Sequence, residues 1–212
     1  MKRILMLACF VTVLFLPREI LAIEIDRINN FNSEIIINRD TSISIKENID
    51  YETSLTKHGI YRYIPIRYNR DNISYSASVK NIIVTDDNKN SIPFAKTTDN
   101  RNVTLKIGDP DTTFSGKKTY IISYQVENAL QEFDDHDELY WDITGEGWQI
   151  PVLKSSAIIK SDVASIKNII CYSGPIGEND GKCSSQFVEN KAEFSYNQQI
   201  VYGDNFTIAV AF

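Results

Sequence analysis

The feature that most constrains the fold of this chain is an alternation of apolar and polar residues with a period of two. It is clearest at residues 43–51, where only Glu47 interrupts the apolar side. Successive side chains of a β-strand point to opposite faces, so this pattern predicts a strand that is buried on one face. An apolar run at residues 35–37 precedes it, and turn formers at residues 38–40 predict a hairpin. The alternating apolar residues are Ile43, Ile45, Ile49 and Tyr51.

Similar patterns recur along the chain, and helical periodicity is nearly absent. The one helical candidate is residues 128–140, which we expect to form a helical turn or a loop insertion. About ten short strands separated by turn residues predict an all-β fold, an antiparallel β-sandwich whose layers are compatible with an immunoglobulin-like arrangement. Since no repeat or linker divides residues 23–212, we expect them to form a single domain. Further strands are expected at residues 76–84, 103–107, 120–126, 149–160, 166–171, 187–194 and 206–212.

The N-terminus has a different composition from the rest. Lys2 and Arg3 precede an uncharged apolar run at residues 4–16, and Ala22 offers a small residue at a cleavage position. These are the three parts of a secretory signal, and the run is shorter than the roughly 20 residues that span a bilayer. We interpret residues 1–22 as a signal peptide, with an uncleaved anchor as the alternative. The remaining chain is then expected in the periplasm or on the extracytoplasmic face of the membrane.

The charge balance limits the partners. Removal of residues 1–22 takes away three basic side chains and one acidic side chain, which leaves 19 basic and 27 acidic ones and a formal charge of −8. A negative field repels phosphate backbones, so nucleic acid is not an expected partner. No polybasic cluster is present for anionic lipid, so membrane association is expected only through the N-terminal segment.

Two cysteines remain after the signal segment, because Cys9 lies within it. An even pair in an exported protein indicates a disulfide, here between Cys171 and Cys183. The residues between them are rich in turn formers. A redox or metal-binding pair is the alternative, but the spacing is not that of a Cys-x-x-Cys motif and no histidine lies nearby.

A cluster of acidic residues beside His136 is the most suggestive group for chemistry. Hard cations such as Ca²⁺ take several oxygen ligands from one loop, so this cluster could hold Ca²⁺, although no cofactor is expected otherwise. The segment 108–113 offers further oxygen ligands. A solvated acidic loop is the alternative, and a carboxylate pair acting in general acid–base catalysis is another. The candidate metal ligands are Asp134, Asp135, Asp137 and Glu138.

Three large side chains are candidates for ligand binding. Arg62 could bind a carboxylate ligand through its planar guanidinium, or form a structural ion pair with an acidic residue of the chain. Trp141 and Trp148 bracket a polar turn, where aromatic rings can form a platform for a sugar or a peptide. Packing in the core is the alternative for both tryptophans.

Four ordered blocks resemble the N-terminal extracytoplasmic part of a family of bacterial membrane proteins, the domain of unknown function 2207 (DUF2207) family. The resemblance implies a signal peptide followed by a β-rich domain outside the membrane, usually with transmembrane helices beyond it, and it assigns no catalytic residue. The family usually has Asn where this chain has Asp142. The blocks are residues 58–65, residues 107–124, residues 139–151, and Cys171 with Gly174, Gly177 and Cys183.

These observations favour a non-enzymatic envelope domain that binds another protein, a peptide or a glycan. The chain contains no Gly-x-Ser-x-Gly elbow, no His-Glu-x-x-His motif and no phosphate-binding loop. One alternative is a metal- or carboxylate-dependent hydrolase of envelope polymers that uses the acidic cluster. Another is a truncated remnant of a longer membrane protein.

Overall fold

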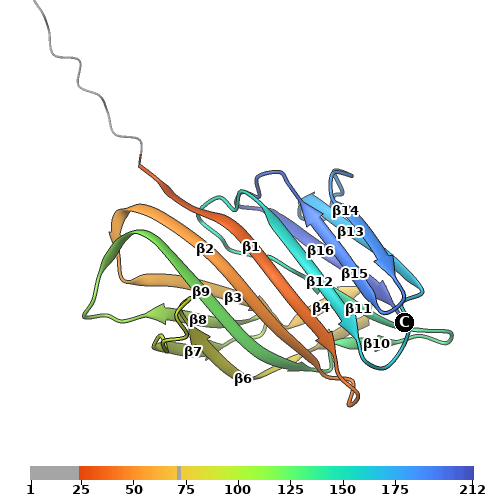
Figure 1. Ribbon diagram of the computed structural model, residues 1–212. Helices are drawn as coiled ribbons and strands as arrows, with labels where there is room; N and C mark the ends of the chain where they lie inside the picture. Colours follow the sequence, from red (N-terminus) through yellow and green to blue (C-terminus); the bar gives the residue numbers. More distant parts are fainter. Residues whose placement is uncertain (1–23, 71–72) are drawn as a thin grey trace, which may run out of the picture.

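The computed structural model describes residues 24–70 and 73–212, and these form sixteen strands joined by turns and loops (Figure 1). This confirms the predicted all-β fold. None of the described residues is helical, and among them no helix is long and apolar enough to cross a membrane. The predicted signal peptide, residues 1–22, lies outside the described residues.

A seven-stranded sheet forms one layer of the molecule (Figure 1). In it, the predicted hairpin joins β1 to β2, and the N–H of Asn38 donates to the carbonyl of Ser42 across its turn. The order of the strands is β14 (Ser184–Val188), β15 (Lys191–Tyr196), β12 (Ser155–Ser161), β1 (Asp26–Ile37), β2 (Ile43–Lys57), β9 (Phe114–Glu127) and β6 (Ser78–Thr85).

One pair in this sheet departs from the predicted antiparallel arrangement. Strands β1 and β12 run parallel, with Phe31 opposite Ser155 and Ile37 opposite Ser161. A hairpin turn forces antiparallel pairing, but these two strands are separated by most of the chain, so no short turn constrains their direction.

Three smaller sheets lie against one face of the seven-stranded sheet (Figure 1). The four-stranded sheet has the order β10 (Leu130–Glu132), β11 (Asp137–Asp142), β16 (Asp204–Ala211) and β13 (Asn168–Pro175). The three-stranded sheet has the order β3 (Gly59–Pro65), β8 (Asn102–Gly108) and β7 (Phe94–Thr98). The two-stranded sheet pairs β4 (Arg67–Arg70) with β5 (Ile73–Ser76).

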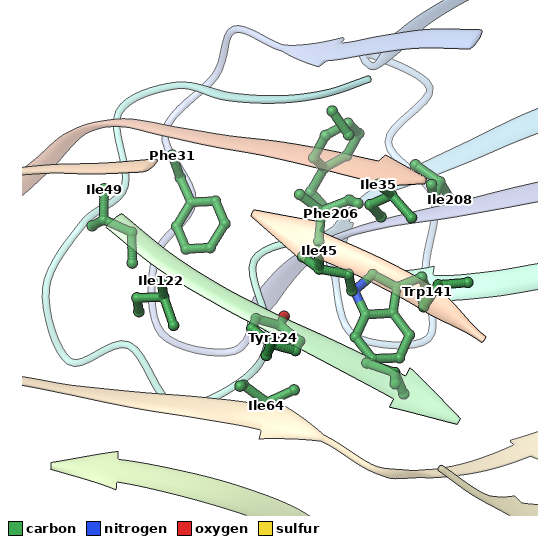
Figure 2. Close-up of a cluster of buried hydrophobic side chains, with 14 of the residues drawn as sticks. Phe31, Ile35, Ile45, Ile49, Ile64, Ile122, Tyr124, Trp141, Phe206 and Ile208 are labelled. Atoms are coloured by element: carbon green, nitrogen blue, oxygen red, sulfur yellow. The ribbon is translucent and has the colours of Figure 1, made fainter. Parts of the chain in front are cut away.

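The core lies between these layers, as Figure 2 shows for one part of it. Isoleucines of β1 and β2 face Ile64 of β3, Trp141 of β11 and Phe206 of β16 there. The predicted alternation is confirmed, because every second residue of β2 from Ile43 to Tyr51 is buried. Glu47 is the polar member of that buried row.

The prediction of a helical turn or a loop insertion at residues 128–140 is wrong. Strands β10 and β11 form a hairpin there, with Leu130 opposite Leu139, and the N–H of Phe133 donates to the carbonyl of His136 at its turn. The cause is tertiary: β11 also pairs with β16 along its whole length, so the sheet supplies its backbone hydrogen bonds.

Two further strand predictions had wrong boundaries. Residues 187–194 form a hairpin of β14 and β15 rather than one strand, and Glu189 at its turn has a φ of 53°. Residues 149–160 become a regular strand only from Ser155, because the preceding stretch makes only isolated bridges at Val152. Pro151 within that stretch has no N–H to donate to a ladder.

Candidate functional site

Arg62 lies at the centre of a buried polar junction between the layers. Its side chain is fully buried and forms a two-pronged ion pair with Glu47 of β2, with Nε–Oε2 and Nη2–Oε1 distances of 2.8 and 2.6 Å. The hydroxyl of Tyr124 on β9 donates to the same carboxylate at 2.6 Å. The guanidinium carbon also lies 5.1 Å from the centre of the Phe31 ring. Side chains of β1, β2, β3 and β9 therefore meet at one buried ion pair.

The remaining donors of Arg62 bind the loop that follows β11. Nη1 donates to the carbonyls of Tyr63 and Thr144, and Nη2 lies 3.3 Å from the carbonyl of Ile143. Burial by itself lowers the pKa of Arg62, but the Glu47 carboxylate and its hydrogen bonds raise that pKa above its ordinary value. The guanidinium is thus charged, neutralised and saturated with acceptors inside the protein.

Gly145 completes this junction by its lack of a side chain. Its φ is +68°, and a Cβ atom there would lie 2.2 Å from Nη1 of Arg62 and 2.5 Å from the carbonyl oxygen of Tyr63. The indole Nε1 of Trp148 donates to the carbonyl of Thr144 at 2.9 Å, the same oxygen that accepts from Arg62. The loop therefore packs onto Arg62 through its backbone.

Asp142 is the second buried acid beside this junction. Its Oδ1 accepts from the N–H of Gly145 at 2.9 Å. Burial raises the pKa of Asp142 to about 7, against the opposing effects of that hydrogen bond and of Arg62. The resemblance to the family implies an asparagine at this position. Its Oδ1 would accept the same hydrogen bond, and no charge would have to be buried.

The structure places the three predicted binding residues in the interior. Arg62, Trp141 and Trp148 are 0%, 1% and 8% exposed, so in this arrangement the carboxylate partner of Arg62 is Glu47 of the same chain. The structure brings Arg62 and Trp148 together at the Thr144 carbonyl. Trp141 packs elsewhere in the core, with its ring centre 5.8 Å from that of Tyr68.

The structure does not bring the four predicted metal ligands together. Asp134 and Asp135 lie exposed in the turn between β10 and β11, and Asp135 bonds to His136. Asp137 and Glu138 are consecutive on β11, so their side chains point to opposite faces. In residues 24–70 and 73–212, no group of three or more potential ligand side chains is placed to hold a metal ion.

The predicted cysteine pair is joined. A disulfide connects Cys171 on β13 to Cys183, which immediately precedes β14, with a Cα–Cα distance of 6.2 Å. Asp180 in the enclosed loop accepts from the hydroxyls of Ser173 and Tyr196. This corner thereby ties an edge strand of the four-stranded sheet to an edge strand of the seven-stranded sheet.

An open cleft of about 620 Å³ lies at one end of the three-stranded sheet, and we call it the Tyr61 cleft. Tyr61 is 49% exposed at its rim and stacks on Tyr63, with ring centres 6.3 Å apart and planes inclined by 15°. Its lining is mainly apolar, with Lys106, His58 and Asp109 as the polar groups. The apolar lining residues include Ile60, Pro93, Phe94, Ala95, Ile107 and Pro110.

Two glycines form a side of the cleft that consists of bare backbone. Gly59 and Gly108 are paired across β3 and β8. A Cβ atom on Gly59 would lie 1.7 Å from the carbonyl oxygen of Ile107, and one on Gly108 would lie 2.1 Å from that of His58. The close contact between β3 and β8 at this point therefore requires glycine at both positions.

A smaller pocket of about 180 Å³ lies on the other side of Tyr61, and Trp148 lines part of it. No pattern in the sequence singled out Tyr61, Phe94 or Lys106. Alternation offered one signal for Tyr61, since an inward Arg62 implies an outward neighbour on the same strand. Nothing in the sequence predicted that Phe94 and Lys106 would lie beside it.

Residues 27–212 match the family described as "Predicted membrane protein (DUF2207) N-terminal domain", and the chain belongs to this family. The resemblance inferred from the four blocks is therefore confirmed. Two of the blocks are in contact in the structure, because Arg62 from the first binds the carbonyls of Ile143 and Thr144 in the third.

A relative and two solved structures extend this comparison. The chain is 29% identical over 133 residues to "Uncharacterized protein YciQ" of Escherichia coli, which covers 60% of this chain and 21% of that protein. The chain thus spans about a fifth of that relative. Two structures of leukotriene A4 hydrolase from yeast each superpose with a TM-score of 0.51, at 9% and 11% identity, over 88% of this chain and 29% of the enzyme. At such identities the likeness concerns the fold alone.

Proposed function

We propose that this chain is an extracytoplasmic, non-enzymatic binding domain of its membrane-protein family, and that the Tyr61 cleft binds a peptide segment of an envelope protein. The observation that carries the proposal is the cleft itself: an open, mainly apolar hollow with a few polar groups at its rim. Sites for small ligands and peptides have this combination of apolar walls and sparse polar groups.

The lining favours a peptide as the occupant. The exposed rings of Pro93 and Pro110 offer contact to an apolar side chain, while the ammonium of Lys106 offers an ion pair to a carboxylate. The exposed ring of Tyr61 adds a rigid aromatic surface, which costs little conformational entropy on binding. The expected ligand is therefore a segment with an apolar side chain close to an acidic group.

Selection from a displayed random-peptide library against the immobilised protein tests this proposal. Peptides recovered from it should carry an apolar residue near an acidic one, and Tyr61→Ala should weaken their binding about tenfold or more. Lys106→Glu should also weaken the binding of these peptides, because it reverses the charge that would pair with their acidic residue. Tyr202→Ala is the matched control, because Tyr202 is 72% exposed at a turn outside the cleft. Recovery of no peptide, or of peptides indifferent to both cleft variants, would contradict the proposal.

The extracytoplasmic address rests on the signal-like N-terminus and on the cysteine pair, since disulfides persist in oxidising compartments. The intact mass of the protein from fractionated bacteria tests it. A periplasmic species that begins at Ile23 and is two hydrogens lighter than the reduced chain is the expected result. A reduced species confined to the cytoplasm would refute the address.

A further inference from the structure

The two edges of the seven-stranded sheet differ in how they are protected. Edge strands present unpaired backbone groups, and natural proteins block them with charges, prolines or bulges. Strand β6 has such protection: its register with β9 shifts between Lys80 and Ile83, Asn81 has a φ of 52°, and Lys80 pairs with Glu127. This edge is bent and charged.

Strand β14 has none of these devices. Its sequence Ser-Ser-Gln-Phe-Val carries no charge and no proline, and its register with β15 is uninterrupted from Ser184 to Val188. All five residues are exposed, and within the described part of the chain no strand pairs with its outer side. The edge is therefore uncharged and regular in its register with β15, and no strand of the described residues pairs with its outer side.

Phe187 marks where a buried row of the sheet reaches this edge. It lies opposite Ala192, and the same row continues through Ile159, Ile35 and Ile45. Those four residues are at most 2% exposed, whereas Phe187 is 40% exposed. A further strand beside β14 would extend the row and cover the Phe187 ring.

We propose that β14 pairs antiparallel with β14 of a second copy of this chain, about a two-fold axis through Gln186. Such an axis, normal to the sheet, places Gln186 opposite its own copy, Ser184 opposite Val188 and Ser185 opposite Phe187. Opposing residues then share a face of the sheet, as antiparallel pairing requires. The seven-stranded sheet thereby continues across the two copies.

Charge complementarity favours a second copy as the partner. Lys182 just before the strand and Glu189 just after it carry opposite charges, and the two-fold axis brings Lys182 of one copy near Glu189 of the other at both ends. A five-residue edge buries little area, so the dimer is expected to be weak and dependent on concentration.

Cysteine cross-linking of the full chain, in a Cys9→Ser background, tests the register. Gln186→Cys should form a disulfide-linked dimer under mild oxidation, because the two-fold axis places this residue opposite itself at about 5 Å between Cβ atoms. Ile83→Cys on the protected β6 edge is the matched control, since Ile83 is 60% exposed. Equal cross-linking of the two variants would overturn the proposal.

Sedimentation of the same full chain tests the association independently of oxidation. The unmodified chain should show a concentration-dependent dimer, and Gln186→Lys should weaken it about tenfold or more because two ammonium groups then face each other. Ile83→Lys, which adds the same charge at the other edge, should leave the dimer intact. A monomer at every concentration up to about 0.5 mM would overturn the proposal.

Discussion

Two regions join the layers of this domain, and they do so by opposite means. At the Arg62 junction, a fully buried guanidinium binds the carboxylate of Glu47 on the seven-stranded sheet. It also binds the carbonyls of Ile143 and Thr144 in the loop after β11. At the disulfide corner, one covalent bond joins Cys171 to Cys183 beside exposed loop residues.

The two regions differ in how far their stabilising effect depends on the rest of the fold. The corner links residues 12 positions apart, so it constrains the unfolded chain as well as the folded one. The junction links Arg62 to Thr144 over 82 positions, and it is favourable only when every buried donor finds its acceptor. Loss of one partner at the junction should therefore cost more than loss of the bond at the corner.

The largest effect is expected from Arg62→Met. This change leaves the Glu47 carboxylate buried without its counter-ion, and it should lower the free energy of unfolding by about 3–5 kcal/mol in chemical denaturation. The double variant Arg62→Met with Glu47→Leu should recover part of that loss, because no uncompensated charge remains. A double variant no more stable than the single one would show that packing, rather than charge, dominates the junction.

Replacement of both Cys171 and Cys183 by alanine should cost about 3 kcal/mol, because the short loop between them is no longer closed in the unfolded state. Denaturation of the unmodified chain with and without reductant provides the comparison. Reductant should lower its stability by a similar amount and leave the double variant unchanged. An effect larger than that of Arg62→Met would reverse the ranking of the two regions.

A pair of glycine variants separates steric contact from backbone strain. Gly145 and Gly177 both have positive φ, at +68° and +89°, but a Cβ atom on Gly177 would meet nothing within 4 Å. Gly177→Ala should cost about 1 kcal/mol for its backbone conformation alone. Gly145→Ala should cost about 2 kcal/mol more, because its Cβ would displace Arg62. Thermal unfolding of both variants measures the difference.

Asp142 is expected to make the stability of the protein depend on pH. The folded-state pKa of about 7 lies above the ordinary value of 3.8, so the folded protein binds this proton more tightly than the unfolded chain. Stability should therefore fall as pH rises between about 4 and 7 and level off above that range. Asp142→Asn removes this dependence, so its advantage over the unmodified chain should grow by up to about 1 kcal/mol per pH unit.

Unfolding measured at pH 5 and pH 8 checks this prediction. Asp162→Asn serves as the control, because that residue is exposed and the change should affect stability equally at both values. An advantage of Asp142→Asn that is the same at pH 5 and pH 8 would mean that Asp142 does not titrate in this range.

Alternation was enough to predict most strands, because burial of one face of a sheet repeats every second residue. The rows through Ile45 and Ile122 show this, and Glu47 was recognised as the exception in its row. The candidate site was harder to predict from the sequence than the strands were. The types of Arg62, Trp141 and Trp148 were compatible with ligand binding and equally with a structural ion pair and core packing. The side chains that bury them come from distant segments, and Tyr61 was not singled out although it lies beside Arg62.

The sequence by itself determined the all-β class and the faces of the strands, because these depend on local periodicity. It also determined the cysteine pair, because only two cysteines follow the signal-like segment. Only the tertiary structure decided that Glu47 would meet Arg62, that β1 would run parallel to β12, and that β14 would lie at an open edge. The physical reason is that pairing between distant strands is selected by the packing of the whole core, which no local pattern encodes.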